Sequence, residues 1–413
     1  MARICFIAYG LNRANIGLQP WRYLIELARG IQFYGNELIL IGEEDFQIQN
    51  PIGNSFLQVI SRNKKKSYFR IADGVIIKIN SIKPDLVVMG FGPSSIVYWS
   101  ILRRINVPFI GILLSTPPRI IEVIRTKNSW IMEDLLKPIA LLIDAAIPRG
   151  LVRRFLDNPR FLQFIVLSSA SQNWLLSLGI DPQKISLLPP GKDKVTRFNG
   201  ASELRKKLNI PNDCITICYV GSPAFVRGPD ILLKAFRKFS DSESRVRLLM
   251  ILRESEAPKK LSKYTKMLRG ISRHLQIEEK VIFITENLDR KSFLAMMGGC
   301  DAAVFPFKII EAECPLSVME AIEEGVLVVA SRNDGIPDIV RGRRAILIQP
   351  EERDLRNGLI EITKMMKKND STKSNQSTEY LEFPTWEEVS LKFQKLVEEV
   401  TQGEWCQETM EST

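Results

Sequence analysis

The run from Val326 to Ala330 constrains the fold more than any other stretch of this chain. Its residues, VLVVA, are all apolar, without the polar positions that alternate along a half-exposed strand. Such a run is typical of a strand that is covered on both faces, as strands of parallel sheets are. A short helix is predicted just before it, because Pro315 suits a first helical turn and Gly325 suits a helix end. The segment therefore predicts a helix that leads into a parallel sheet.

Strands and helices alternate along most of the chain. Apolar strands are expected at 2–10, 36–42, 84–92, 107–114 and 160–169, and again at 214–221, 246–252, 280–285 and 302–307. The clearest amphipathic helices between them are expected at 20–35 and 229–240. This alternation predicts the α/β class, with doubly wound parallel sheets.

A segment at 187–199 divides the chain, because it is rich in proline, glycine and charge and follows neither periodicity. Two Rossmann-like domains and a C-terminal extension are predicted, over 1–195, 196–380 and 381–413. The polar stretch 367–380 is expected to be a flexible loop. Residues 386–400 are expected to form an amphipathic helix, and the residues after it a frayed tail.

The net charge of +10 is concentrated in the first predicted domain. Residues 1–195 hold 24 Lys and Arg against 14 Asp and Glu, whereas the rest of the chain holds 33 of each kind. The basic clusters are 62–66 with Arg70, and Arg149, Arg153, Arg154 and Arg160. This asymmetry indicates an anionic partner. Charge alone does not decide whether that partner is a membrane surface, a lipid phosphate or a nucleic acid. The alternative is that the surplus of positive charge only makes the protein more soluble.

Composition also limits the location and the kinds of site. No apolar run approaches the roughly 20 residues of a membrane-spanning helix. Nothing resembles a signal peptide, so a cytoplasmic protein is expected. The six cysteines are scattered, without paired metal-ligand spacing, so reduced thiols and no metal site are expected.

Two carboxylates lie around the start of the helix that precedes Val326. Glu313 comes just before the helix and Glu320 lies one turn into it, while Leu316 and Ser317 carry amides of its first turn. Helix N-terminal amides favour phosphate, and carboxylates accept hydrogen bonds from sugar hydroxyls. The pattern therefore indicates a site for a polyol phosphate. Solvated glutamates on a surface helix are the alternative.

With the stretch YVGSPAFVRGPDILLKAF at 219–236, this segment resembles the retaining glycosyltransferases of family 4, or glycosyl transferases group 1. The likeness is good over 165–345 and holds in outline for the first half. It implies the GT-B architecture, in which two Rossmann-like domains face each other across a cleft and the last helix packs back on the first domain. It also implies transfer of a sugar from a nucleotide-diphosphate-sugar donor, without a cofactor.

The resemblance carries roles to individual residues. Glu320 would hold the ribose hydroxyls of the donor, and Glu313 would contact the donor sugar. Six residues separate this pair instead of the usual seven, so Glu311 stays open as the sugar-contacting residue. The remaining assignments are Arg227 and Gly221 at the donor diphosphate, the amides of Leu316 and Ser317 at the leaving group, and Gly17 facing the donor phosphates and the acceptor.

The chain departs from the family pattern at several positions. Ser222 stands where an arginine is usual, which removes one of two cations near the diphosphate. The stretch LLSTPPR places Ser115 and Thr116 where many members have a histidine. The only histidine, His274, is expected on the surface of the second domain. Asp338 stands where glutamate is usual and is expected to support the nucleotide site indirectly.

These observations predict a retaining hexosyltransferase whose acceptor is a saccharide, a lipid-linked saccharide or a lipid phosphate. A catalytically weak or inactive nucleotide-sugar-binding relative is the alternative, and a sugar-nucleotide epimerase of the same fold is a further one. No nucleic-acid partner is expected, because no aromatic-interleaved basic stretch or known motif accompanies the charge.

Peripheral attachment to the cytoplasmic leaflet is predicted from the region 131–155. It mixes basic side chains with apolar ones, which are Trp130, Leu135, Leu136, Leu141 and Leu142. Such a mixture is typical of helices that lie on an anionic lipid surface. Ordinary helices packed against the sheet are the alternative.

Overall fold

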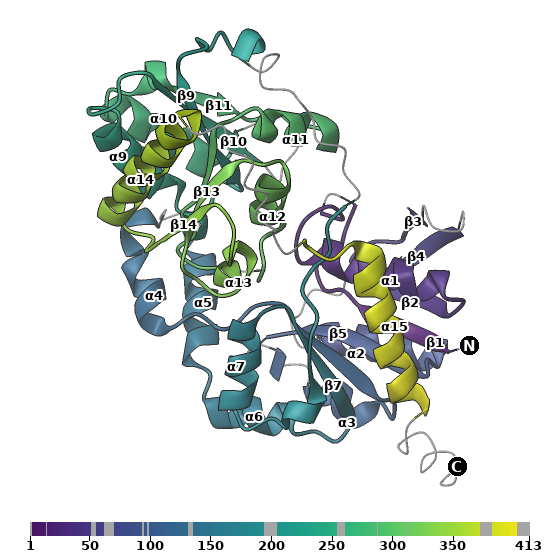
Figure 1. Cartoon of the computed structure of the whole chain (residues 1–413). Helices are drawn as coiled ribbons and strands as arrows, with labels where there is room; N and C mark the ends of the chain where they lie inside the picture. The colour runs from purple at the N-terminus through teal and green to yellow at the C-terminus, as the bar shows by residue number, and fades with distance from the viewer. Residues whose placement is uncertain are drawn as a thin grey trace.

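The structure is a computed structural model. It describes residues 2–13, 15–50, 55–61, 70–92, 95–96, 99–130, 135–193, 205–253, 261–286, 288–310, 312–371 and 382–402. Within these ranges the chain forms two α/β domains, each built around one sheet (Figure 1). The expected fold class is confirmed. The predicted boundaries at 195/196 and 380/381 both lie outside the described residues and stay predictions.

The first sheet has the strand order β3-β4-β2-β1-β5-β6-β7-β8. Its strands are β1 Arg3–Ile7, β2 Glu37–Gly42, β3 Phe46–Asn50, β4 Ser55–Ser61, β5 Leu86–Phe91, β6 Phe109–Leu113, β7 Phe161–Val166 and β8 Ile185–Leu187. Neighbouring strands are parallel, except for β3 and β4. Strands β5 and β6 are almost wholly buried, as their continuous apolar sequences predict.

Helices cover both faces of this sheet. They are α1 Trp21–Phe33, α2 Arg70–Ile82, α3 Trp99–Arg104, α4 Ile120–Arg125, α5 Leu136–Ala146, α6 Arg149–Leu156 and α7 Ser169–Ser177. Because side chains alternate along a strand, β1 contributes to two cores. Ile4 and Phe6 share one buried cluster with α1, while Cys5 and Ile7 share the other with α2, α3, α6 and α7.

The second sheet is parallel throughout, with the order β11-β10-β9-β12-β13-β14. Its strands are β9 Ile215–Gly221, β10 Val246–Leu252, β11 Val281–Ile284, β12 Ala302–Phe305, β13 Leu327–Ser331 and β14 Ala345–Ile348. The helices of this domain are α9 Pro229–Phe239, α10 Lys263–His274, α11 Arg290–Gly298, α12 Leu316–Glu323, α13 Ile336–Val340 and α14 Glu352–Ser371. The run that predicted a doubly covered strand is β13, which is buried along its whole length.

One expectation for the second domain was wrong. The stretch 367–380 was expected to be a loop, but residues 367–371 belong to α14, and the remainder lies outside the described residues. Helix α14 is polar overall, yet Leu355, Leu359 and Ile362 recur on one face and are fully buried. This sparse stripe packs on α9, which lies far away in the sequence, and on β13 and β14. The short strands β3, β4, β8 and β14 were also not anticipated.

The C-terminal helix α15, Trp386–Gln402, packs on the first domain, as the GT-B architecture requires (Figure 1). It runs alongside α1, and the Phe393 ring meets the Phe6 ring edge-on at 6.0 Å. Gly30 of α1 permits this approach, because a Cβ atom there would lie 2.2 Å from the Cβ of Ser390. The amide of Asn36 donates to Gln394 at 3.0 Å and adds a buried polar contact.

Candidate functional site

The candidate site lies where loops of the two domains meet. In the first domain these loops follow β6 and β7, and in the second they follow β9, β12 and β13. All of them leave the carboxyl ends of parallel strands, which is where open α/β sheets bind ligands. The helical segment Lys127–Ser129, which precedes α5, brings a further part of the first domain against α9.

Glu313 lies fully buried in this interface. Its backbone N–H donates to the carbonyl of Leu114 at 2.8 Å, and its Oε1 accepts a hydrogen bond from the hydroxyl of Ser168. Ser168 is also the N-cap of α7, so the carboxylate lies close to a helix N-terminus of the first domain. Among the described residues, Oε2 of Glu313 has no hydrogen-bond partner although it is buried. A buried, unpartnered carboxylate oxygen is a position where a ligand hydroxyl could donate.

Burial raises the pKa of Glu313 to about 7. The hydroxyls of Ser168 and Ser171 oppose this rise, whereas the nearby carboxylates of Asp334 and Asp338 add to it. Burial likewise raises the pKa of Asp334 to about 6, against a hydrogen bond of 2.5 Å from the hydroxyl of Thr116. The interface therefore holds two carboxyl groups that resist ionisation below neutral pH.

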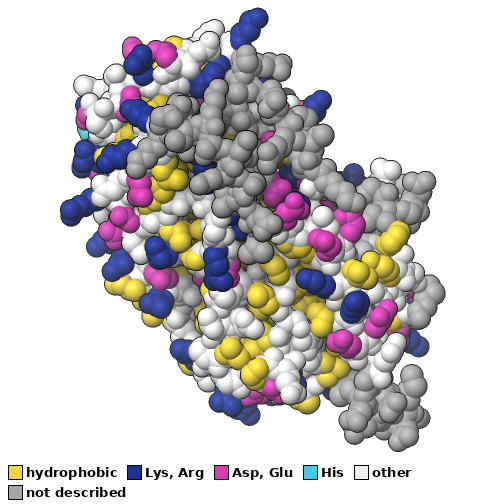
Figure 2. Space-filling model, viewed as in Figure 1, with side chains coloured by type: hydrophobic (Ala, Val, Ile, Leu, Met, Phe, Trp, Pro, Cys, Tyr) yellow, Lys and Arg dark blue, Asp and Glu magenta, His cyan; other side chains and the backbone are white. Residues whose placement is uncertain are grey.

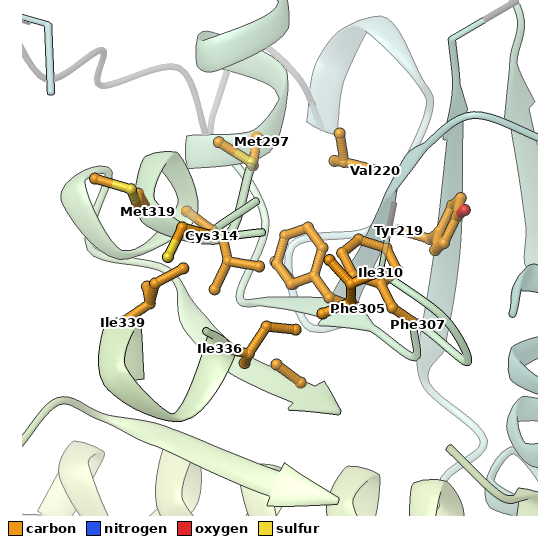
Figure 3. Packing of buried hydrophobic residues seen from close by; sticks show 14 of the residues in the cluster. Tyr219, Val220, Met297, Phe305, Phe307, Ile310, Cys314, Met319, Ile336 and Ile339 are labelled. Atoms are coloured by element: carbon orange, nitrogen blue, oxygen red, sulfur yellow. The ribbon is translucent and has the colours of Figure 1, made fainter. Parts of the chain in front are cut away.

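The loop that presents Glu313 adopts an unusual backbone conformation. Cys314, the next residue, has φ of 54°, a left-handed conformation that costs a non-glycine residue about 1 kcal/mol. Its thiol donates to the carbonyl of Leu167 at 3.2 Å, and its side chain lies among Met319, Ile336 and Ile339 (Figure 3). The packing and this thiol contact hold the strained residue in place. Glu311, the alternative to Glu313, lies outside the described residues.

Glu320 lies on the side of α12 that faces α1 and α11. Its Oε1 accepts a hydrogen bond from Arg290 at 2.9 Å, and the guanidinium of Arg22 lies 3.7 Å away. Asp193 binds the same two arginines, so the four side chains form one ionic network. The network joins the first domain, the interdomain segment and the second domain. Within the described residues, Oε2 of Glu320 is buried without a hydrogen-bond partner.

Electrostatics in this network favour its charged form. Burial alone would raise the pKa of Asp193. The guanidinium groups of Arg22 and Arg290 lower it by more than burial raises it, so the pKa of Asp193 lies below its ordinary value. Burial alone would lower the pKa of Arg290, but Glu320 and Asp193 raise it above the ordinary arginine value. The charged forms of Asp193 and Arg290 are thus stabilised by their neighbours in the network.

The crevice beside Glu320 is narrow. Its lining includes Arg22, Asp193, Arg290, Leu316 and Glu320, and it encloses about 30 Å³. Ligand pockets in proteins measure roughly 300–1,000 Å³, so this crevice is far smaller than a sugar nucleotide requires. Hydrogen bonds between the domains engage Glu313 and Asp334 at the same interface.

Gly221 is the last residue of β9 and Arg227 follows it, so both lie at the carboxyl edge of the second sheet. The Arg227 guanidinium lies over the ring of Phe307, 4.7 Å from its centroid, and no ion pair joins it to a described carboxylate. A Cβ atom at Gly221 would lie 2.8 Å from the hydroxyl of Tyr219, so the glycine permits a tight contact. Both residues are at the expected edge, and their roles stay predictions.

Leu316 and Ser317 form the first turn of α12, where amides lack partners within the helix. These amides are thus available to a ligand, as a role at the leaving group requires, and that role stays a prediction. Gly17 lies exposed in the loop between β1 and α1, where a Cβ atom would meet nothing within 4 Å. No described contact joins Gly17 to Glu313, Glu320 or Arg227. His274 is exposed at the end of α10, as expected.

Several residues of the site were not found from the sequence. Ser168 of α7 and Arg22 of α1 carry no local signal, because a serine at a helix start and an arginine on an amphipathic helix are common. Asp338 was expected to support the nucleotide site, and the structure places it against the first domain. Its carboxylate accepts from the backbone N–H of Ser169 at 2.7 Å and from the Ser169 hydroxyl at 3.0 Å.

A second polar cluster joins the domains next to Arg227. Lys308, which follows β12, donates to Asp230 at 2.8 Å and to the hydroxyl of Ser129 at 2.7 Å. The Ser129 hydroxyl in turn donates to Asp230 at 2.6 Å. Burial lowers the pKa of Lys308, although Asp230 opposes this effect. The cluster is a second point at which opening of the domains would break hydrogen bonds.

Comparison with known proteins agrees with the family resemblance. Residues 201–378 match the family profile described as glycosyl transferases group 1. A D-inositol 3-phosphate glycosyltransferase of Corynebacterium kroppenstedtii is 25% identical over 247 residues. That match spans 53% of this chain and 52% of the relative, so it reaches about half of either protein.

Solved structures share the fold over nearly the whole chain. The sucrose-phosphate synthase of Thermosynechococcus elongatus superposes with a TM-score of 0.69 at 16% identity, covering 97% of this chain and 99% of its own. Anabaena HepE in complex with UDP and glucose gives a TM-score of 0.67 at 16% identity, covering 96% and 100%. These likenesses establish the GT-B arrangement of two Rossmann-like domains.

Proposed function

We propose that the whole protein is a retaining glycosyltransferase, since residues 201–378 match the family profile of the glycosyl transferases group 1. It would move a hexose from a nucleotide-diphosphate-sugar donor to an acceptor. The observation that carries the proposal is the pair Glu313 and Glu320. Both lie at the carboxyl edge of the second sheet, Glu313 fully buried and Glu320 half-buried, and each keeps one buried oxygen without a partner among the described residues.

The two carboxylates suit different parts of one donor. The free oxygen of Glu313 would accept from a hydroxyl of the donor sugar, and that of Glu320 from the ribose diol. Arg227 would neutralise the leaving diphosphate, with the amides of Leu316 and Ser317 placed to stabilise charge at the start of α12. In this mechanism the donor phosphate, rather than a protein base, takes the proton of the acceptor.

Donor binding requires the interface to open. The hydroxyl of Ser168 occupies one oxygen of Glu313, and Arg290 occupies one oxygen of Glu320. The crevice beside Glu320 encloses about 30 Å³, which is less than a sugar nucleotide requires. We propose that the domains separate to admit the donor and close again on it, so that ligand hydroxyls take over positions held here by protein groups.

A second candidate, nucleotide-sugar binding without turnover, is favoured by one observation. Thr116 stands at the position where many members have a histidine, and its hydroxyl is committed to Asp334 at 2.5 Å. Neither Ser115 nor Thr116 of this loop titrates near neutral pH, so neither can replace that histidine as a base. Both candidate functions involve binding of the same nucleotide-sugar donor, but only the transferase would break the bond between the sugar and the diphosphate.

A binding and hydrolysis experiment tests both candidates. The protein is mixed with UDP-, GDP- and ADP-sugars, starting with UDP-glucose because HepE was solved with UDP and glucose. A ligand at 100 times its dissociation constant should stabilise the fold by about 2.7 kcal/mol in a thermal-shift assay. Slow donor hydrolysis without acceptor supports the transferase, and stabilisation without hydrolysis supports the binding protein. No stabilisation by any nucleotide sugar would reject both.

The surface of the first domain supports a membrane-associated acceptor. Large aliphatic side chains are exposed along α4 and α5, namely Ile120, Ile121, Ile124, Leu136, Ile139 and Ile143, with Leu136 exposed by 82%. Basic residues flank them, including the exposed Arg119, Arg125 and Lys127. Figure 2 shows hydrophobic and basic side chains intermixed along the edge of the molecule that α4 and α5 form. No helix among the described residues is both long and apolar enough to cross a bilayer.

The apolar residues of this surface differ from those expected. Trp130, Leu141 and Leu142 are partly buried against the core, and of the expected set Leu136 is the exposed one. The basic cluster 62–66 lies outside the described residues. We propose that α4 and α5 lie on the cytoplasmic leaflet and that the acceptor is lipid-linked or a lipid phosphate. Each basic residue near an anionic surface contributes about 1 kcal/mol.

Liposome co-sedimentation tests the membrane proposal. The protein should bind vesicles that contain acidic lipid, and binding should fade as salt rises. The double variant Ile139→Ser and Ile143→Ser should bind more weakly, while Leu391→Ser on α15, an exposed aliphatic residue far from the patch, serves as control. Binding that ignores acidic lipid at low salt, or that the double variant retains in full, would reject the proposal.

A further inference from the structure

A second arginine lies at the carboxyl edge of the second sheet, beside the strand that leads to Arg227. Arg253 follows β10, whose register pairs Leu252 with Gly221, the last residue of β9. The backbone N–H of Arg253 donates to the carbonyl of Gly221 at 3.0 Å, which extends the sheet ladder by one residue. The side chain of Arg253 therefore starts next to Ser222.

The guanidinium of Arg253 is positioned by packing and not by a carboxylate. It lies over the ring of Phe293 in α11, 4.0 Å from the ring centroid. No hydrogen bond or ion pair joins this guanidinium to any described side chain. An arginine that stacks on an aromatic ring keeps its donors free while losing little conformational freedom on binding.

The surroundings of Arg253 carry excess positive charge. Burial lowers the pKa of Arg253, and the guanidinium groups of Arg290 and Arg22 lower it further, while Glu320 alone opposes them. Glu320 is itself engaged by Arg290 at 2.9 Å. An arginine in this position stays protonated, so its charge is stabilised fully only when an anion arrives.

We infer that Arg253 is a second diphosphate-binding residue, which acts from the opposite side of β9 to Arg227. The inference rests on the proposed function, because it names the protein group that meets the donor's diphosphate. A nucleoside diphosphate carries roughly two to three negative charges, more than one arginine balances. Ser222 supplies no charge at this edge.

The sheet order places Arg253 on one side of β9 and the ring that Arg227 covers on the other. Arg227 leans over Phe307, which follows β12, while Arg253 follows β10, and β9 runs between them. Neighbouring strands are about 4.8 Å apart, so the ends of β10 and β12 lie roughly 10 Å apart. Two arginine side chains that converge across this gap can bind a diphosphate between them, each through two N–H donors. A role limited to balancing Glu320 is the competing explanation.

The test compares a nucleoside diphosphate with its nucleoside, using UDP with uridine, GDP with guanosine and ADP with adenosine. Affinities are measured by titration calorimetry for the full chain and for Arg253→Met, which keeps an apolar stem over Phe293. The variant should bind the diphosphate roughly tenfold or more weakly, while nucleoside binding changes less than about twofold. The control variant Arg245→Met removes an exposed charge that pairs with Asp213, and it should change neither affinity.

A relocated charge provides the decisive comparison. Ser222→Arg, added to Arg253→Met, places a guanidinium on the neighbouring strand and should recover most of the lost diphosphate affinity. Equal losses for diphosphate and nucleoside, or an unchanged diphosphate affinity, would overturn the inference. Unfolding of Arg253→Met is checked by its melting curve, and Arg253→Gln then replaces it under the same criteria. If the parent binds no diphosphate of the three, the proposed function fails and the inference fails with it.

Discussion

Replacement of Glu313 by glutamine should stabilise the protein in a pH-dependent way. The carboxyl group has a pKa of about 7 in the folded protein against an ordinary value of 4.5, and burial is the main cause. A group whose pKa is raised by folding adds most to the free energy of unfolding at pH values below its pKa in the unfolded chain. That contribution is lost as the pH rises through the pKa in the folded protein. Glutamine keeps an oxygen that can accept from the hydroxyl of Ser168. Because its side chain does not ionise, the variant does not lose this stability as the pH rises.

The magnitude follows from the shift itself. Each unit of pKa difference corresponds to 1.36 kcal/mol, so the full penalty of ionising Glu313 is about 3 kcal/mol. No discount for solvent is needed, because the residue is fully buried. Between pH 5 and pH 7 the advantage of Glu313→Gln over the parent should grow by about 2 kcal/mol. From pH 7 to pH 8 it should grow by less than about 0.5 kcal/mol.

The assay is urea unfolding of both proteins at pH 5, 6, 7 and 8 at constant ionic strength. The difference between the two proteins isolates residue 313, because the other titrating groups are common to both. Glu361→Gln on the exposed side of α14 serves as control and should give no comparable gain, since water solvates that carboxylate. A Glu313→Gln advantage that is constant across these pH values would refute the buried, interface position of the carboxylate.

The remaining predictions concern the donor site and the C-terminal helix. Glu320→Ala should weaken nucleotide binding by about 1.5–3 kcal/mol. Removal of the donor's 2′-hydroxyl should cost less affinity in the variant than in the parent, and equal losses in calorimetry would contradict the ribose assignment. Arg227→Ala should lower turnover of the sugar donor while nucleoside affinity stays nearly constant, and unchanged turnover would move the cationic role elsewhere. Gly30→Ala should lower the melting temperature by an amount equivalent to about 1–3 kcal/mol, because its methyl group collides with Ser390. Adding Ser390→Gly should restore part of that loss, and a double variant no more stable than Gly30→Ala would contradict the packing argument.

The α/β architecture can be read from the pattern of the sequence. Continuous apolar runs such as Val326–Ala330 indicate doubly covered strands wherever they occur, because burial on both faces removes the need for polar positions. The apolar stripe of α15 is likewise readable, since its period depends only on helix geometry. The spacing of Glu313, Pro315 and Glu320 around a helix start also lies within one short segment. These features are local, and local geometry is the same in every fold.

The partners of these side chains, in contrast, follow from the way the chain packs in three dimensions. Ser168 bonds to Glu313 across 145 residues, and Arg22 meets Asp193 across 171. Nothing in the sequence near either partner indicates such a pair, because it depends on how segments that are far apart in the chain pack together. The same reason explains why α14 was missed and why Leu136, rather than Leu141, faces water. Helical periodicity shows that a face is apolar, and the neighbours that the fold brings to it determine whether that face is covered.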